Sequence, residues 1–327
     1  MKACWFDEFG SPQDVLQQGD WPTPEPNSGE VLVQIHTTGV NPSDVKKRAG
    51  AFPDLLAAGP VIPHSDGAGV ITAVGEGVSP ARVGERVFVY QAQYARQLGT
   101  AAEYVALECA RAPVLPDNAS FEVGACIGIP IMTAHRCVFA DGPVADQLIL
   151  VTGGAGRVGH YAIQWARRAG ARVIATASNE EDTAACREAG AEAVVNHREP
   201  EWGKAALELT GGQKIDRVID VEFGANLPEL LHCVRIGATI ATYSSTVVPE
   251  PELPFRTMMF MDLTVRMVIV YAMPEDAKAQ AVSDTQAALT EGGLQHRIAE
   301  TLPFDQMAKA HEVIEEGSVR GCVVVSI

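Results

Sequence analysis

Three glycines with GxGxxG spacing follow an apolar run in the segment LILVTGGAGRVGHYAIQWARRAGARVIATA, which starts at Leu148. They are Gly154, Gly156 and Gly159. In such a loop the first glycine permits a tight turn, the second lets a pyrophosphate approach the backbone, and the third lets a helix pack closely on a strand. Amides at the helix start then face the phosphates. A chance match is the alternative in a chain with 30 glycines, but the strand before the loop and the helix and strand after it predict a dinucleotide site.

The residues after the second strand, RVIATA, bear on which dinucleotide binds. NAD-selective folds usually place an acidic residue there to hold the ribose hydroxyls, and this chain has Ser178 and Asn179. Their hydroxyl and amide can donate to a 2′-phosphate. Glu180 and Glu181 follow, and no lysine or arginine stands in the ordinary position beside the phosphate. The pattern favours NADPH over NADH. His197, after the third strand, is either a contact to the adenine or 2′-phosphate or a surface loop histidine.

The elements that must position these residues fall into two regions. In the N-terminal part, short β-rich runs such as VLVQIH and AGVITAV alternate with Gly and Pro, as in an all-β region. Further along, apolar strands alternate with helical segments, as in a parallel sheet with helices on both faces. The tail is too short to be an independent domain. The sequence therefore predicts an α/β protein, with a Rossmann-type doubly wound domain over 123–266 and a β domain over 1–122 that is completed by 267–327.

Composition excludes several classes of partner. The formal charge of −16, from 25 Lys+Arg against 41 Asp+Glu, would repel nucleic acid and anionic lipid alike. No apolar run reaches the roughly 18 residues that a membrane span needs, and Asp7 and Glu8 stand where a signal peptide would be apolar. The seven cysteines form no CxxC pair, so neither a disulfide framework nor a zinc knuckle is predicted. We expect a cytoplasmic protein that binds no nucleic acid and no membrane.

Several segments together resemble the zeta-crystallin-like quinone reductases, a zinc-free branch of the medium-chain dehydrogenase/reductase superfamily. They are FDEFGSPQDVL, TTGVNPSDVKKRAG, PHSDGAGVITAVGEGV, VGERVF, GACIGIPIMTAHRC, the glycine loop and AGAEAVVNHREPEW. The likeness runs over essentially the full length. It implies a GroES-like β-barrel domain, completed by the C-terminal tail, and a Rossmann-type cofactor domain, with the active site in the cleft between them.

The resemblance also implies which residues meet the cofactor. The nicotinamide end would lie near Asn41, Lys46 and Thr133, the pyrophosphate near the glycine loop, and the adenosine end near the residues after the second and third strands. Together with the glycine-loop interpretation, the expected cofactor-binding residues are Asn41, Lys46, Thr133, Gly154, Ala155, Gly156, Arg157, Val158, Gly159, Ser178, Asn179, His197, Asn226, Tyr243, Ser244, Ser245, Thr246, Met267, Val268 and Ile269.

Asn41, His64 and Ile129 are the candidates for the substrate cleft, and no catalytic residue is assigned. Asn41 offers an amide that can orient a carboxamide or carbonyl, but without the resemblance it is equally well a turn residue before a proline. Thr133 is either a cofactor contact or a residue near a helix start that bonds only to backbone. His64 stands where the family commonly has glycine, and it is either a proton donor or a structural histidine. Arg157, another departure, would place a cation beside the pyrophosphate.

The ligands of a catalytic zinc are missing. Zinc-dependent relatives need a cysteine in the segment that reads TTGVNPSD here, and Asn41 occupies that position. They also need His followed by Glu, where this chain has Ser65 and Asp66, and His64 is one place out of register. A four-coordinate site with N and S ligands cannot be assembled, so we expect no metal. Without a Lewis acid an alkoxide is not stabilised, whereas an electron-poor quinone or enone accepts hydride unaided.

These observations lead to one hypothesis and two alternatives. The hypothesis is a zinc-independent, NADPH-dependent oxidoreductase that reduces quinones or related electrophilic carbonyl compounds. The first alternative is an enone or enoyl-thioester reductase, with Tyr90 or Tyr94 as a proton donor. The second is a low-turnover NADPH-binding protein, crystallin-like or regulatory. The resemblance implies a homodimer formed by pairing of cofactor-domain sheet edges, and VRMVIVY (265–271) is the candidate edge strand.

Overall fold

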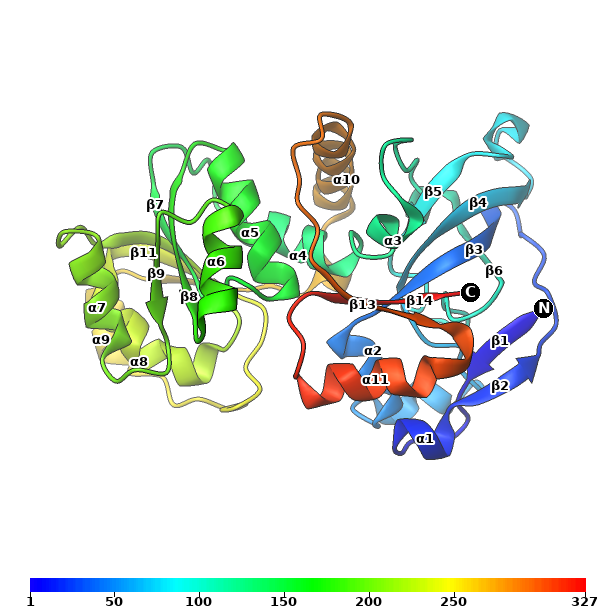
Figure 1. Cartoon of the computed structure of the whole chain (residues 1–327), viewed down its shortest axis with the longest axis horizontal. Coiled ribbons are helices and arrows are strands. Elements are labelled where there is room, and N and C mark those ends of the chain that lie inside the picture. The colour runs from blue at the N-terminus through cyan, green and yellow to red at the C-terminus, as the bar shows by residue number, and fades with distance from the viewer. The chain divides into compact units, whose positions relative to one another are not determined.

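The computed structural model describes all residues, 1–327, and the chain forms two compact units. The N-terminal unit contains Met1–Ile129 and Val282–Ile327, and the cofactor unit contains Pro130–Ala281 (Figure 1). No helix is both long enough and apolar enough to cross a bilayer.

The unit boundaries differ from the expected 122 and 266 for local reasons. At the first boundary, a Cβ on Gly124 would lie 2.5 Å from the Cβ of Ala68, so this part of the chain packs tightly on the N-terminal sheet. At the second, the amide of Val268 donates to the carbonyl oxygen of Thr242 at 2.7 Å, which keeps the start of the tail on the cofactor sheet.

The cofactor unit is built on six parallel strands in the order β12-β11-β10-β7-β8-β9. Read from β9, this is the strand order of the doubly wound dinucleotide-binding fold. The central strand reads LILV and is buried at all four positions, as expected for a strand covered on both faces. The strands are β7 (Leu148–Val151), β8 (Arg172–Ala177), β9 (Ala193–Asn196), β10 (Ile215–Asp220), β11 (Val234–Thr242) and β12 (Thr264–Met267).

Helices connect these strands and cover both faces of the sheet. Figure 1 shows α5 (Arg157–Arg168) and α6 (Glu180–Glu188) on one side, and α7 (Trp202–Leu209), α8 (Phe223–Cys233) and α9 (Phe255–Phe260) on the other. Leu148, Leu150 and Val218 of the sheet share one core with Trp202 and Leu227 of these helices. The unit begins within α4 (Ile129–Phe139), and a short 3₁₀ turn spans Val270–Ala272.

The N-terminal unit contains a mixed sheet in the order β13-β14-β3-β4-β5, with β6 also paired to β3. The C-terminal strand runs antiparallel to β3, with Val323 opposite Val40, so the tail adds to the N-terminal sheet. A separate β1-β2 pair lies near the N-terminus. The strands are β1 (Lys2–Trp5), β2 (Gln17–Asp20), β3 (Glu30–Val40), β4 (Asp66–Val74), β5 (Arg86–Val89), β6 (Tyr104–Glu108), β13 (Ile298–Pro303) and β14 (Cys322–Ser326).

Short helices lie at the ends and on one side of this sheet. The chain leaves β3 through an extended Asn41 and enters α2 at once, because Pro42 has the φ angle that a first helical residue needs. The α-helices are α1 (Pro12–Val15), α2 (Pro42–Arg48), α3 (Phe121–Gly124), α11 (Met307–Glu316) and the second part of α10 (Glu275–Thr290). The 3₁₀ turns span Pro53–Leu56, Pro80–Arg82, Cys109–Arg111 and Phe304–Gln306. Val45 on α2, Val313 on α11 and Val323 on β14 belong to one core.

Candidate functional site

The glycine loop follows β7 and turns back on β8. Gly153 has a φ of +60°, so the tight turn requires glycine here, one position before the GxGxxG pattern. Its amide donates to the Thr176 hydroxyl at 2.9 Å, and the next amide donates to the carbonyl oxygen of the same residue at 3.0 Å. A Cβ on Gly154 would lie 2.8 Å from both Ala175 Cβ and Cys186 Sγ. Gly154 therefore allows close packing on β8 and α6, and the turn itself depends on Gly153, which the sequence analysis missed.

The other two glycines lie at the start of α5. A Cβ on Gly156 would meet only the carbonyl oxygen of Gly153, at 3.2 Å, whereas a Cβ on Gly159 would lie 2.3 Å from it. Gly159 thus lets the helix sit directly on the loop. The amides of Val158 and Gly159 have no acceptor within the chain, as is usual in the first turn of a helix. This end of the helix can bind a phosphate group.

The ends of β8 and β9 lie side by side, since Ala177 pairs with Asn196. Ser178 is half-buried, His197 is exposed, and Arg198 follows it on the surface. The sequence analysis looked for a cation after the second strand and missed Arg198. Parallel pairing of β8 and β9 brings the residues after the third strand to the same sheet edge.

Asn179 has a role that the sequence analysis did not expect. Its Oδ1 accepts from the amide of Asp182 at 2.8 Å, and its Nδ2 donates to Asp182 Oδ2 at 2.8 Å. These are the contacts of a residue that caps the start of α6. The Asn179 side chain therefore caps α6 through Oδ1 and one N–H of Nδ2, and the second N–H of Nδ2 is left for the expected contact to a 2′-phosphate.

A buried carboxylate stands at the end of β10, beside the end of β7, where the strand order reverses. Asp220 is completely buried, and burial raises its pKa. Its Oδ1 accepts from Thr152 Oγ1 at 2.9 Å and Asn226 Nδ2 at 2.8 Å, and its Oδ2 accepts from Thr242 Oγ1 at 3.1 Å. The side-chain amide of Asn226, expected to line the cofactor trough, is thus held by Asp220. Asp220 has no sequence signal, because an acid that ends a buried strand belongs to no motif.

The segment after β11 forms a loop tied to the start of α8. The amide of Thr246 donates to Glu222 Oε2 at 2.7 Å, and Ser245 Oγ accepts from the amide of Gly224 at 3.0 Å. Tyr243 and Ser244, at the start of this loop, are half-buried.

The next expected cofactor residues lie where β12 ends. Met267 and Ile269 are 74% and 56% exposed, whereas Val268 between them is buried. The unit thus carries the expected loop, sheet edge and trough residues at or near the carboxyl ends of its strands.

In the N-terminal unit, Asn41 and Asp66 form a buried pair. Asn41 Nδ2 donates to Asp66 Oδ2 at 2.8 Å, and the amide of Ile129 donates to the same oxygen at 2.8 Å. Burial raises the pKa of Asp66 to about 8. The main-chain N–H of Asn41 donates to Asp44 Oδ2 at 2.9 Å. Burial raises the pKa of Asp44 to about 6. Two of the three cleft candidates, Asn41 and Ile129, thus donate to the same carboxyl group. In the sequence, Asp66 was noted only because it occupies the position of a zinc ligand.

Two lysines on α2 have different surroundings. Lys46, an expected cofactor contact, is exposed. Lys47 is buried, and its Nζ donates to the carbonyl oxygen and to Oε1 of Gln93 at 2.9 and 2.7 Å. Thr133 is also buried, on α4.

His64 is enclosed by protein. Its Nδ1 is 2.9 Å from Thr38 Oγ1, and its Nε2 is 2.9 Å from Nε2 of His311 on α11. Burial lowers the pKa of His64 to about 3, and burial also lowers that of His311. Both ring nitrogens of His64 face internal partners, so the geometry favours the structural histidine over the proton donor.

The donor set around Asn41 is unlike a zinc site. A catalytic zinc takes three ligands from Cys, His and acidic side chains. Here Asn41 and Asp66 hydrogen-bond to each other, and His64 is directed to Thr38 and His311. No group of three or more His, Cys, Asp or Glu side chains in the chain is arranged to hold a metal ion.

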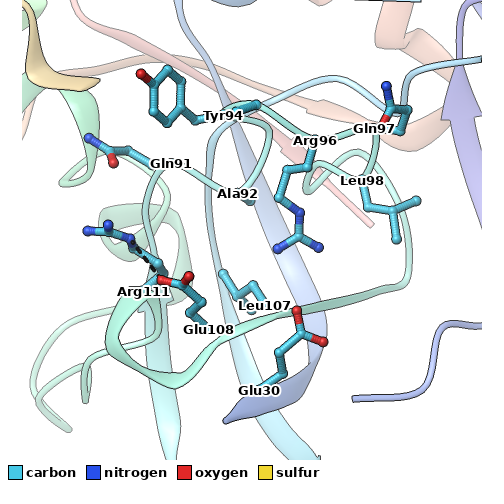
Figure 2. A pocket seen from close by; sticks show the side chains of 11 residues that line it. Glu30, Gln91, Ala92, Tyr94, Arg96, Gln97, Leu98, Leu107, Glu108 and Arg111 are labelled. Atoms are coloured by element: carbon cyan, nitrogen blue, oxygen red, sulfur yellow. Dashed lines mark ion pairs between the residues drawn. The ribbon is translucent and has the colours of Figure 1, made fainter. Parts of the chain in front are cut away.

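A cavity of about 550 Å³ lies in the N-terminal unit between the 91–98 loop and the end of β6 (Figure 2). Figure 2 shows Arg96 extending from the loop toward β6, beside an ion pair in which Arg111 Nε is 3.8 Å from Glu108 Oε2. Tyr94, which is exposed, is among its lining residues, and Tyr90 is not. None of the expected cofactor or cleft residues lines this cavity.

Comparisons with known proteins agree with this architecture. Residues 27–117 match the alcohol dehydrogenase GroES-like domain, and residues 158–287 match the zinc-binding dehydrogenase family. The human quinone oxidoreductase is 32% identical over 97% of this chain and 95% of its own length, and that of Salmonella typhimurium is 27% identical over 97% and 96%. A mycobacterial protein solved in complex with NADPH is 28% identical, with a TM-score of 0.88 and full coverage of both chains. The chain therefore belongs to the zeta-crystallin-like quinone oxidoreductases of the medium-chain dehydrogenase/reductase superfamily, and it is an oxidoreductase of that type.

Proposed function

We propose that this oxidoreductase uses NADPH to reduce quinones or related electrophilic carbonyl compounds without zinc. The observation that carries the proposal is the start of α5, where a glycine loop after a buried strand leaves the amides of Val158 and Gly159 without acceptors. Relatives named quinone oxidoreductase, and a relative solved with NADPH, support the same choice of cofactor and acceptor.

The adenosine end of the cofactor would meet the edge formed by β8 and β9. Ser178 offers a hydroxyl, and His197 and Arg198 offer a ring N–H and a guanidinium. A guanidinium binds a phosphate through paired charge-assisted hydrogen bonds, whereas a ribose hydroxyl gains less from it. These side chains support NADPH over NADH.

The nicotinamide end would meet Asn41, Lys46 and Thr133. When bound, the reduced ring supplies a hydride, and the acceptor that receives it takes its remaining proton from water. The protein's part is to hold the ring and the acceptor in one orientation and to exclude water around them. The Asn–Asp pair at the positions of two zinc ligands supports a reaction that needs no Lewis acid.

The decisive measurement is oxidation of NADPH, followed by its absorbance, with a panel of quinones, enones and crotonyl thioester. We expect turnover with quinones or enones that does not change after chelator treatment or on addition of zinc. Faster turnover of the thioester would favour the enoyl reductase. Tight NADPH binding without turnover of any acceptor would favour a binding protein, and no calorimetric binding of either nucleotide would overturn the proposal.

We propose further that the protein is a homodimer formed through β12. This strand pairs only with β11, so its other edge is open for pairing. Phe255, Phe260 and Met267, on and beside this part of the unit, are each at least 70% exposed. Replacing Val265 with proline at this edge should shift the sedimentation coefficient from dimer to monomer, and a wild-type protein that sediments as a monomer would contradict the proposal.

A further inference from the structure

We propose that Asp66 is a positioning residue for hydride transfer, which orients the side-chain amide of Asn41. The inference rests on the proposed function, because the role of Asn41 at the nicotinamide belongs to that proposal. Asp66 itself touches neither cofactor nor acceptor in this assignment and acts only through Asn41.

The first step is the direction of the amide. Asn41 is 4% exposed, and its Nδ2 is fixed 2.8 Å from Asp66 Oδ2. The amide group is planar with nitrogen and oxygen on opposite branches, so Asn41 Oδ1 is turned away from Asp66. A flipped amide has nearly the same shape but would place two oxygens together. Asp66 therefore decides which polar atom Asn41 presents to a ligand, together with the main-chain amide of Asp44, which faces the Asn41 side chain in the capping box at the start of α2.

The second step is the rigidity of Asp66. Its Oδ2 also accepts from the amide of Ile129 at 2.8 Å. A Cβ on Gly128 would lie 2.1 Å from Asp66 Oδ1, so only glycine leaves room for the carboxyl. The carboxyl group is thus held by the main chain on one side and by β4 on the other, and it links the start of α2 to the start of α4.

The third step is the free oxygen. Asp66 Oδ1 is buried without a hydrogen-bond partner, whereas Oδ2 accepts two N–H donors. A proton on Oδ1 leaves both bonds to Oδ2 intact, so the alignment of Asn41 does not depend on the charge of Asp66. It depends on an acceptor oxygen at Oδ2, which asparagine can supply and alanine cannot.

The test is a double-mutant cycle with Asn41→Ala, Asp66→Ala and both together, measured as kcat/KM for NADPH-dependent quinone reduction. We expect each single variant to lose at least about tenfold, and the double variant to be no more than about twofold below Asn41→Ala. The primary readout is the stereospecificity of hydride transfer. NADPH is labelled with deuterium at C4, and the label shows which face of the ring delivers the hydride. Both single variants should lose stereospecificity, which a purely structural defect does not change.

Thr100→Val is the matched control. It removes the hydroxyl that bonds the main-chain oxygen of Asp66 but leaves the carboxyl group in place. We expect it to lower the unfolding temperature while preserving stereospecificity. If Asp66→Ala does not fold, Asp66→Asn is the second variant: its amide oxygen can accept from both Asn41 Nδ2 and the amide of Ile129, so the folded variant should keep stereospecificity.

The outcomes separate the two proposals. A wild-type protein that oxidises no NADPH with any acceptor removes the proposed function and this inference with it. Two results with an active wild type overturn this inference alone. In the first, Asp66→Ala lowers kcat/KM by the same factor in the wild type and in Asn41→Ala. In the second, Asn41→Ala keeps full stereospecificity. Loss of stereospecificity in a folded Asp66→Asn variant also overturns it.

Discussion

The candidate sites of the two units are built from different polar groups. The cofactor unit presents main-chain amides at the start of α5, and its buried acid, Asp220, is bonded by three side chains. The N-terminal unit buries Asp44, Asp66, His64 and His311 completely or almost completely, and several of their polar atoms have no partner. In the proposed function, the first arrangement binds a phosphate through backbone geometry. The second holds side chains in fixed orientations at the cost of buried polar groups.

This difference matters for function because the two tasks tolerate different changes. A loop of glycines fails when a side chain is added where the backbone packs closely, whereas a buried polar cluster fails when one hydrogen-bonding atom is removed. The experiments below test whether binding belongs to the cofactor unit and orientation to the N-terminal unit.

The largest effect is expected from Gly159→Ala. The new Cβ would lie 2.3 Å from the carbonyl oxygen of Gly153, so α5 must move away from the loop. We expect NADPH binding, measured by fluorescence titration, to weaken by roughly 100-fold. Gly156→Ala is the control for stability, since its Cβ would meet only one atom, at 3.2 Å, and the unfolding temperature should change little. Unchanged binding by Gly159→Ala would contradict the assignment of this loop.

A smaller effect is expected from the pH dependence of stability. Burial raises the pKa of Asp66 from its ordinary 3.8 to about 8, so the folded protein keeps a proton that the unfolded chain releases. Stability from this group is complete below about pH 4 and is lost as the pH rises to about 8. Between pH 6 and 7.5 the wild type should lose about 2 kcal/mol of unfolding free energy relative to Asp66→Asn, measured by urea denaturation.

The comparison with Asp66→Asn removes this titration, whereas Asp44, Lys47 and His64 titrate in both proteins; Asp44 and Lys47 interact with Asp66, so the difference includes their coupling to it. Asp117→Asn, which changes an exposed side chain, should give a curve parallel to that of the wild type. Parallel curves for Asp66→Asn as well would mean that Asp66 is ionised in the folded protein at pH 6.

The smallest effect is expected from Arg198→Ser at the edge of the cofactor unit. Loss of one guanidinium should weaken NADPH binding by about tenfold and leave NADH binding unchanged, because only the former has a 2′-phosphate. Arg187→Ser, on the exposed end of α6, is the matched control. Equal loss of affinity for both nucleotides would mean that other residues contact the 2′-phosphate.

Much of the cofactor unit could be predicted from the sequence because its signals are local. The glycine loop, the strand before it and the helix after it lie within some thirty residues, and apolar runs predict the parallel strands. The capping role of Asn179 was missed although a local signal existed. It stands three residues before Asp182, which is the spacing of a helix cap, and the structure uses it in that way.

The sequence by itself determined the two-part fold, the dinucleotide loop and the family, because periodicity and short-range spacing encode strands, helices and turns. Only the tertiary structure decided that Asn41 is held by Asp66 and that His64 bonds to His311, which lies 247 residues away. It also decided that the residues after β9, which include Arg198, follow at the same sheet edge as Ser178, since Ala177 pairs with Asn196. Hydrogen bonds between buried side chains depend on where whole elements pack, and no local pattern in a single chain carries that information.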